Sequence, residues 1–271
     1  MSILNWLRSF PAMKTGLKPT RHPMWLEGKH ILLTGATRGI GRALATQLIK
    51  DGATVIAVAR NTEALTALAW ELGPQLQPYT CDLQNVQDRE ELIEKLTSAP
   101  QPLDGVINNA GIQIEADYMV AGRNDLAKNI AAEIDINLVA PLHLCASLAI
   151  HLAQRPEGFI VNVTSGLVLF PKQNAPIYCA TKAGLRSFTT ALRYQAEQLA
   201  PNMLVCECIM SLVDTDMTQG RGSGKITPDK AAQQLLQGLR RGSDEIWIGK
   251  TRALRWINRL SPKLAAKILH G

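Results

Sequence analysis

Two residues of this chain, Tyr178 and Lys182, combine types and spacing suited to acid–base chemistry. On a helix, residues four apart share one face, one turn from each other. A phenol has a pKa of about 10, and an ammonium group within about 4–6 Å lowers that pKa toward neutrality. Such a pair can exchange a proton with a carbonyl or an alcohol. Chance easily supplies Tyr-x-x-x-Lys, and most such pairs are solvated on a helix surface, so the prediction depends on the rest of the chain.

The length and composition of the chain predict one globular domain. Its 271 residues are enough for a full α/β core, and 46% hydrophobic and 19% charged residues are ordinary values. No run of about 18 uninterrupted apolar residues predicts a membrane span, and the N-terminus lacks a secretory signal. The five cysteines have no neighbours that predict a metal site, and Cys206 and Cys208 are interpreted as buried small hydrophobes. A reducing, cytoplasmic location is therefore predicted.

The net charge of +6 is concentrated at the two ends of the chain. Residues 1–29 carry 5 basic and 1 acidic groups, and residues 240–271 carry 8 basic and 2 acidic groups. Residues 30–239 carry 16 basic and 20 acidic groups. An acidic body argues against a basic groove through the fold, so no nucleic-acid partner is predicted.

Buried strands alternate with amphipathic helices along most of the chain. Strands are predicted at residues 29–34, 53–59, 77–80, 103–108, 159–164, 204–209 and 245–248, and helices at 41–51, 62–72, 86–96, 178–199 and 229–240. This alternation predicts a single-domain, Rossmann-like α/β fold, a doubly wound parallel sheet flanked by helices. Residues 1–27 are interpreted as an N-terminal extension outside the core, 28–250 as the domain, and 251–271 as a basic amphipathic tail.

Three glycines, Gly35, Gly39 and Gly41, join the first predicted strand to the first helix. Glycine permits positive φ and close backbone approach, and a helix N-terminus offers free N–H groups to a pyrophosphate. Glycines alone are a weak signal, because turns need glycine anyway. Between a buried strand and a helix at the start of an alternating pattern, they predict a dinucleotide site.

Two arginines indicate which dinucleotide this site would prefer. An NAD site usually has an acidic residue at the end of the second strand to hold the ribose hydroxyls. Here that strand ends in Arg60, and Arg38 lies within the glycine loop. Guanidinium groups suit a 2′-phosphate, although both could be ordinary surface arginines. NADP(H) is therefore the predicted cofactor.

At this point the sequence resembles the short-chain dehydrogenase/reductase family. The matching motifs occur in the family's order across residues 29–217, and each is weak singly but the set is specific. They are Thr34-Gly35-Ala36-Thr37-Arg38-Gly39-Ile40-Gly41, Cys81-Asp82-Leu83, Asn108-Asn109-Ala110-Gly111, Asn137, Val163-Thr164-Ser165 and Tyr178-Cys179-Ala180-Thr181-Lys182. The segments 109–113, 140–144 and 163–167 further resemble the group associated with D-alanylation operons, which implies no defined substrate.

The resemblance implies a role for each of four catalytic residues. Tyr178 would exchange a proton with the substrate oxygen, and Lys182 would lower its pKa and bind the nicotinamide ribose. Ser165 would hold the carbonyl oxygen; it lies at a strand's C-terminal end, where open α/β sheets bind ligands, but could be a turn or cap residue. Asn137 would join a water relay to Lys182, or simply be a satisfied polar helix residue.

The resemblance also implies a set of residues around the cofactor. Asp82 would meet the adenine edge, unless it is a helix N-cap, and Asn109 and Gly111 would line the cofactor floor. The full set is Gly35, Thr37, Arg38, Gly39, Ile40, Gly41, Arg60, Asp82, Leu83, Asn109, Ala110, Gly111, Tyr178, Lys182, Val213 and Thr215.

One segment departs from the family pattern, and another gives a limited indication of the substrate. The family usually has Pro-Gly after the sixth strand, where this chain has Met210 and Ser211, so the seating of the nicotinamide is in doubt. Residues 166–171 are apolar and favour an apolar ketone or aldehyde, although they could equally pack as core. Residues 219–225 form a flexible segment where such folds place a lid.

The tail from residue 251 is predicted to form two short helices, the second beginning with Ser261 and Pro262. It has an apolar stripe, which comprises Ile257, Leu260, Leu264 and Ile268, and a basic stripe, which comprises Arg252, Arg255, Arg259, Lys263 and Lys267. A basic amphipathic helix can lie on an anionic membrane surface, which would make the protein membrane-associated. Docking of the apolar stripe on the domain or on a second subunit is the favoured alternative.

These observations together predict an NADP(H)-dependent oxidoreductase that interconverts a small-molecule carbonyl and an alcohol. The alternatives are a non-catalytic NADP-binding regulatory protein, and a peripheral membrane or interaction protein that acts through its basic ends. A regulator would need the glycine loop and the arginines but not a proton relay. The family's usual pairing through helices near 137–152 and 178–199 implies a homodimer or homotetramer.

Overall fold

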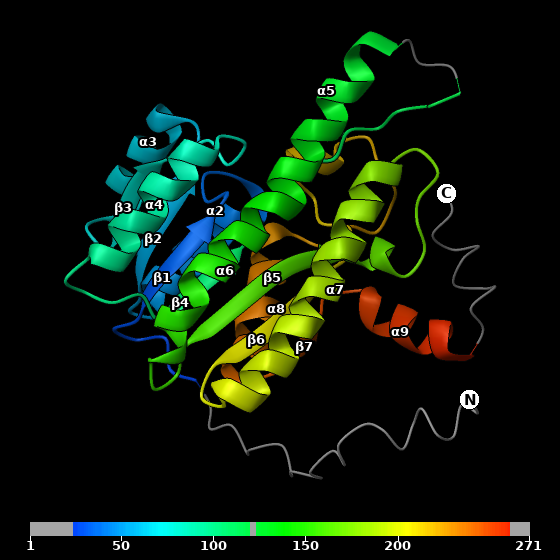
Figure 1. The fold of residues 1–271 in the computed structure, drawn as a ribbon. Helices are drawn as coiled ribbons and strands as arrows, with labels where there is room; N and C mark the ends of the chain where they lie inside the picture. The colour runs from blue at the N-terminus through cyan, green and yellow to red at the C-terminus, as the bar shows by residue number, and fades with distance from the viewer. Residues whose placement is uncertain (1–23, 120–122, 261–271) are drawn as a thin grey trace, which may run out of the picture.

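Seven parallel strands form one sheet, in the order β3-β2-β1-β4-β5-β6-β7 (Figure 1). The computed structural model describes residues 24–119 and 123–260. The strands are β1 (His30–Thr34), β2 (Thr54–Ala59), β3 (Leu76–Thr80), β4 (Gly105–Asn108), β5 (Phe159–Ser165), β6 (Leu204–Met210) and β7 (Glu245–Trp247). The chain runs outward from β1 to β3, then crosses to β4 and runs outward to β7, with every pair parallel. The predicted doubly wound sheet is confirmed.

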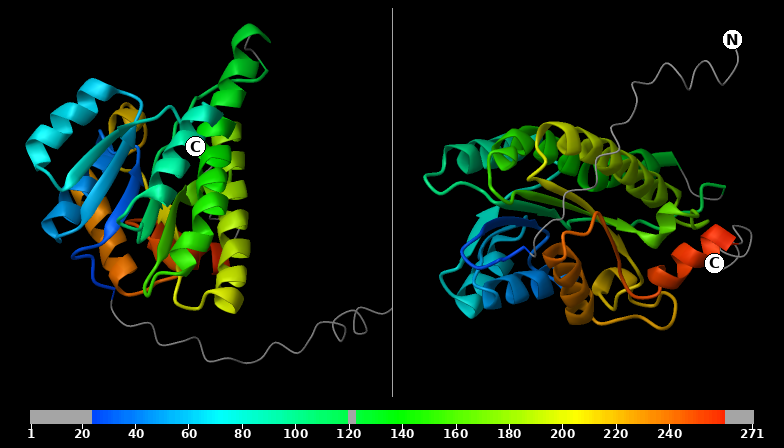
Figure 2. Two further views of the ribbon diagram at one scale, coloured as in Figure 1. Left: turned by 60° about the vertical axis from the view of Figure 1, so that its left-hand side comes forward. Right: turned by 90° about the horizontal axis from the view of Figure 1, so that it is seen from below.

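Helices cover both faces of this sheet (Figure 2). They are α2 (Gly39–Lys50), α3 (Thr62–Leu72), α4 (Val86–Ser98), α5 (Arg123–Ile134), α6 (Ala140–Ala153), α7 (Pro176–Leu199), α8 (Pro228–Arg240) and α9 (Thr251–Leu260). Apolar side chains of α2, α3 and α8 form a core with one face, and those of α4, α6 and α7 form a second core with the other. This arrangement explains why the strands are nearly continuous apolar runs, as in β1, where Ile31, Leu32 and Leu33 are fully buried.

The longest helical stretch was only partly predicted from sequence. No helix was predicted over α5, which continues through a π-helical turn (Asp135–Val139) into α6. Pro141 lacks an N–H, so it cannot form the α-helical hydrogen bond to the carbonyl of Asn137. The N–H of the preceding residue, Ala140, donates to the carbonyl of Asp135, five residues back, which is the π-helical pattern. Leu126–Ala153 is long and apolar enough to cross a membrane by length and composition alone. Here it packs against α4, α7 and β5, as a core helix does.

The two predicted boundary segments lie closer to the domain than the sequence suggested. Met24 and Leu26 were assigned to an extension outside the core, but both are buried in the core between the sheet and α8. At the other end, Thr251 and Leu254 of α9 are buried, so the beginning of the predicted tail docks on the domain. Residues 1–23 and the predicted helix from Ser261 lie outside the described residues.

Candidate active site

A cavity of about 1090 Å³ lies at the carboxyl ends of the strands. The loops that follow β1 to β6 all contribute to it, as expected for an open α/β sheet. It is lined by the predicted residues Gly35, Thr37, Arg38, Gly39, Ile40, Gly41, Arg60, Asp82, Leu83, Asn109, Ala110, Gly111, Ser165, Tyr178, Lys182, Val213 and Thr215. Of the predicted site residues, Asn137 alone does not line the cavity. The volume is ample for an extended cofactor and a small substrate.

The glycine loop is closed so tightly that two of its residues leave no room for a side chain. Gly35 has φ of 68°, and a Cβ there would lie 2.9 Å from the Cα of Ala110. A Cβ on Gly41 would lie 1.9 Å from the carbonyl oxygen of Gly35. The N-cap residue Arg38 makes no side-chain cap bond, and the first turn of α2 has no acidic residue. Its N–H groups and positive dipole are therefore available to a phosphate group, which fits a dinucleotide.

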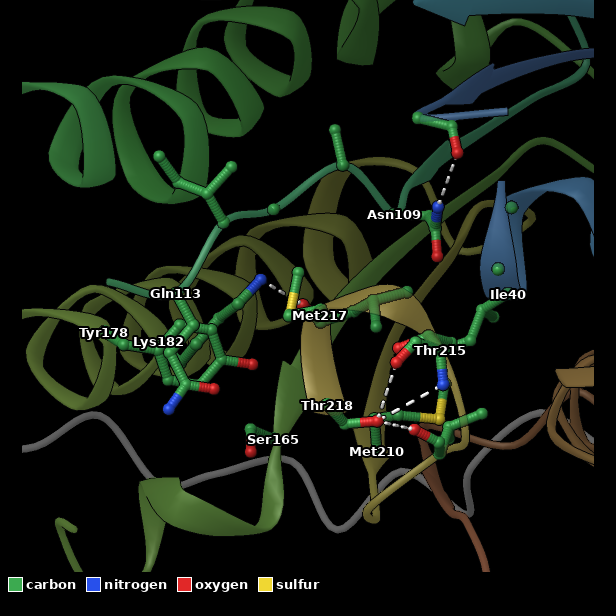
Figure 3. Close-up of a pocket in the computed structure, with 18 of the residues that line it drawn as sticks. Ile40, Asn109, Gln113, Ser165, Tyr178, Lys182, Met210, Thr215, Met217 and Thr218 are labelled. Atoms are coloured by element: carbon green, nitrogen blue, oxygen red, sulfur yellow. Dashed lines mark hydrogen bonds between the residues drawn. The ribbon is translucent and has the colours of Figure 1, made fainter. Parts of the chain in front are cut away.

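Asn109 holds this loop against the end of β4. Its side-chain nitrogen donates to the carbonyl oxygens of Thr34 at 3.0 Å and Gly35 at 3.3 Å, and Figure 3 marks one of these bonds. The Thr34 hydroxyl in turn accepts from the backbone N–H groups of Asn109 and Ala110. The predicted cofactor floor is thus joined to the glycine loop by four hydrogen bonds.

The cavity end next to β2 carries the two predicted arginines. Arg38 and Arg60 are both exposed along its wall, and neither makes an ion pair with another described residue. Asp82, which follows β3 and also lines the cavity, accepts from the backbone N–H of Gln84 at 3.1 Å. Asp82 is not the N-cap of α4, because Asn85 occupies that position. An anionic group bound at this end of the cavity would meet both guanidinium groups.

The predicted acid–base residues converge in another part of the cavity, where Figure 3 shows Tyr178, Lys182 and Ser165 together. Tyr178 and Lys182 occupy successive turns of α7, and the Lys182 Nζ lies 5.8 Å from the centre of the tyrosine ring. Ser165, the last residue of β5, lies near enough to Tyr178 for its side chain to lower the pKa of the phenol. Its Oγ also accepts from the backbone N–H of Leu167 at 3.2 Å, so the residue caps a turn as well.

The ionisation of this pair differs from the sequence-based expectation. Burial raises the pKa of Tyr178 to about 12, and the Ser165 side chain and the positive charge of Arg221 only partly offset that effect. Burial lowers the pKa of Lys182 to about 8; its Nζ donates to the carbonyl oxygen of Val163 at 2.9 Å. Desolvation disfavours the charged form of both groups, so the tyrosine pKa is raised where the sequence predicted that it would be lowered. The phenol is therefore protonated at neutral pH.

Asn137 lies behind the cavity wall, in the π-helical turn. Its Oδ1 accepts from the N–H of Ile112 at 2.9 Å, and its Nδ2 donates to the carbonyl of Ile112 at 2.8 Å. A further bond reaches the Thr181 hydroxyl at 3.3 Å. The side chain is a well-satisfied polar group, which joins the loop after β4 to α7 beside Lys182.

Met210, the last residue of β6, and Ser211, which follows it, show no backbone strain. No non-glycine residue in the described ranges has a positive φ, so this turn does not require glycine. Both side chains line the cavity, and the buried Ser211 Oγ has no hydrogen-bond partner among the described residues. Further on, Val213 is buried, and the Thr215 side chain lies against the glycine loop, 3.0 Å from where a Cβ of Gly39 would be.

Several cavity residues were not predicted as site residues. Thr251 and Leu254 of α9 pack over Gly166, where a Cβ would lie 3.0 Å and 3.6 Å from their side chains, and Ile257 also lines the cavity. Arg221 contributes from the predicted lid, and Lys172 from the loop after the apolar segment 166–171. Only the lid position of Arg221 had a signal in the sequence, because contacts between distant loops leave no local pattern.

Comparison with known proteins agrees with this geometry. The family model of the short chain dehydrogenases matches residues 29–225. The uncharacterized oxidoreductase DltE of Bacillus subtilis is 36% identical over 238 residues, which cover 86% of this chain and 92% of that protein. This similarity confirms the resemblance to the short-chain dehydrogenase/reductase family.

Solved structures share the fold across nearly the whole chain. A short chain dehydrogenase from Burkholderia cenocepacia in complex with NADP superposes with a TM-score of 0.79 and 25% identity, covering 92% of this chain and all of that one. A short chain dehydrogenase/reductase from Burkholderia phymatum in complex with NAD gives a TM-score of 0.77 and 19% identity, covering 88% of this chain and 96% of that one.

Proposed function

The chain belongs to the short chain dehydrogenase family, and from this premise we propose that it is an NADP(H)-dependent oxidoreductase that interconverts a carbonyl and an alcohol. The observation that carries the proposal is one cavity with two chemically distinct ends. Tyr178, Ser165 and Lys182 lie together at one, and the glycine loop with Arg38 and Arg60 lies at the other. A protein that only bound the nucleotide would not need the first group.

The preference for NADP(H) is supported by charge. Arg38 and Arg60 face the cavity without ion-pair partners among the described residues, and charge-assisted hydrogen bonds to a phosphate would satisfy both. The end of β2 offers Arg60 where an NAD site commonly has an acidic residue. The related structure from Burkholderia cenocepacia contains NADP, in line with this proposal.

The glycine loop with Arg38 and Arg60 would hold NADPH, which, when bound, would supply a hydride for the substrate's carbonyl carbon. Ser165 holds the carbonyl oxygen by a hydrogen bond, and the Tyr178 hydroxyl donates its proton to the same oxygen, which gives the alcohol. Lys182 lies one helical turn from Tyr178, so its positive charge stabilises the phenolate that remains. The carbonyl oxygen of Val163 holds the ammonium group in this position. With its pKa raised to about 12, the Tyr178 hydroxyl carries its proton at neutral pH and can act as the acid in the reduction.

The proposed function can be tested by a screen of varied ketones and aldehydes in which the oxidation of NADPH is measured. We expect turnover of at least one carbonyl class, and formation of the matching alcohol. Tight NADPH binding without oxidation by any carbonyl in the screen would instead favour a regulatory protein that senses the nucleotide.

The pH dependence of reduction should report Lys182 rather than Tyr178. With a pKa of about 8, Lys182 loses its charge as the pH rises through that value, whereas Tyr178, at about 12, stays protonated. The phenolate formed in the reaction then loses its stabilising charge, so kcat/KM should be level near neutrality and fall above about pH 8. Steady-state rates between about pH 6 and 10 measure this. Lys182→Met should give a low rate without this inflection, and an unchanged inflection in that variant would reject the assignment.

We also propose that the protein forms a homodimer or homotetramer through α6 and α7. These helices lie side by side on one face of the molecule (Figure 1), and they expose Ile150, Tyr194 and Leu199. Such apolar exposure on adjacent helices is typical of an interface. Light scattering should give two or four times the chain mass, and Tyr194→Glu should lower it; a monomeric wild-type protein would contradict the proposal.

A further inference from the structure

Arg221, in the lid segment after β6, has a buried guanidinium nitrogen with nothing bound to it. Its Nε forms an ion pair with the Glu115 Oε1 at 3.2 Å. Its Nη1 is fully buried, yet has no hydrogen-bond partner among the described residues. A buried, unpaired donor on a charged group is costly, and native proteins usually satisfy it, often with a ligand. Because Arg221 lines the cavity, the missing acceptor can come from a molecule bound there.

The ion-paired cluster of Arg221, Lys172 and Glu115 carries one net positive charge. Lys172 pairs with the same Glu115 Oε1, also at 3.2 Å. One carboxylate thus serves two cations, and all three side chains are at least two-thirds buried, with exposed fractions of 23–31%. Lys250 lines the cavity too, with its Nζ 3.4 Å from the carbonyl oxygen of Ser223. Partial burial strengthens these charges, so the cluster favours an incoming anion.

This cluster lies at the substrate end of the cavity rather than the nucleotide end. The charge of Arg221 is close enough to Tyr178 to lower the pKa of its phenol. Lys172 is likewise near α7, the helix that carries Tyr178, since its backbone N–H donates to the Cys179 Sγ at 3.3 Å. Arg38 and Arg60, in contrast, belong to the loops after β1 and β2. Apolar side chains of Leu167, Met217 and Ile257 line the same cavity.

We propose that Arg221, supported by Lys172 and oriented by Glu115, binds an anionic group of the carbonyl substrate. The substrate class is a carbonyl compound with an apolar body and a carboxylate or phosphate. This revises the expectation of a wholly apolar ketone or aldehyde, and it rests on the proposed reductase function. Arg221 is thus a specificity-determining residue; the proton and hydride transfers remain as described.

Matched aldehydes test the proposal in the full-length protein. The kcat/KM for 4-carboxybenzaldehyde should exceed that for its neutral methyl ester by about tenfold or more, since a charge-assisted hydrogen bond contributes about 1.5–3 kcal/mol. 4-Formylphenyl phosphate distinguishes a phosphate from a carboxylate preference. Arg221→Gln should abolish the preference, measured as the ratio of the kcat/KM for the acid to the kcat/KM for the ester in the same variant. Arg221→Lys should retain part of it, and Lys50→Gln, on the exposed end of α2, should retain all of it.

Two further measurements separate this inference from the proposed function and from cofactor binding. In the Tyr178→Phe background, the Kd of 4-carboxybenzaldehyde for the NADPH-bound protein should rise at least tenfold on Arg221→Gln, even if no aldehyde is turned over. If wild-type protein bound 4-carboxybenzaldehyde in this Arg221-dependent way but turned over no aldehyde, the reductase function would be contradicted and the anion-binding role of Arg221 would stand. Equal preference for acid and ester, or a preference that survives Arg221→Gln, would overturn the inference. So would a raised NADPH Kd with unchanged substrate preference, because Arg221 would then serve the cofactor's phosphates.

Discussion

Replacing Tyr178 with phenylalanine should lower the turnover of carbonyl substrates by about 10³-fold or more, because the variant lacks the phenolic proton that the proposed mechanism transfers to the substrate oxygen. The Ser165 hydroxyl can still orient that oxygen, but its own proton is far less acidic than a phenol. The ring that remains fills the same space, so the Kd for NADPH should change by less than about threefold. Single-turnover rates and a fluorescence titration of NADPH measure the two quantities separately.

The matched control is Tyr194→Phe, the same substitution on the exposed face of α7. It should leave the chemical rate unchanged under conditions where the oligomeric state is the same. If Tyr178→Phe kept more than about one tenth of the wild-type rate, another group would have to be the acid. If it lost NADPH binding as well, the loss of turnover would no longer report on proton transfer.

The second large effect concerns the choice of nucleotide. We expect wild-type protein to bind NADPH at least tenfold more tightly than NADH, since only the former carries a 2′-phosphate for Arg38 and Arg60. Replacing either arginine with alanine should raise the Kd of NADPH about tenfold or more, as the loss of a charge-assisted hydrogen bond does. The Kd of NADH should stay within about threefold, so the double variant should bind the two nucleotides almost equally.

Arg42→Ala is the control for general charge effects. Arg42 lies on the same helix as the glycine loop but pairs with Glu71 at 2.7 Å, away from the cavity lining. Its removal should change the Kd values of both nucleotides little and equally. Equal affinity of the wild-type protein for NADPH and NADH would reject the roles given to Arg38 and Arg60.

The sheet and most helices were predictable because their signal is local. Strands such as β6 are largely apolar runs. The helix α3 begins after Asn61, whose side chain caps it, and ends before Gly73. Hydrophobic periodicity and turn residues are short-range properties, so they survive without knowledge of the fold. Motif order then places the glycine loop and Tyr178 at the same edge of the sheet, because parallel strands all end there.

The other findings depend on contacts between distant segments. The pairing of Glu115 with Arg221 joins residues that are 106 positions apart, and neither lies in a periodic element. The raised pKa of Tyr178 likewise follows from its burial, which the spacing to Lys182 does not reveal. The helix α5 was missed because its sequence, rich in polar residues, has only a weak apolar stripe. In each case the deciding quantity is the tertiary environment.

The cavity residues proposed to bind the nucleotide and those proposed to bind the substrate come largely from different parts of the sequence. Residues 35–111 supply most walls of the predicted nucleotide site, and Val213 and Thr215 complete it, whereas the remaining walls around Tyr178 come from other residues of 165–257, which include α9. We therefore expect mutations in the lid and in α9 to alter substrate preference while the predicted nucleotide site stays intact. For protein engineering, α9 and the lid are the natural segments to exchange with relatives, and an affinity tag is better placed at the N-terminus than next to a helix that borders the substrate.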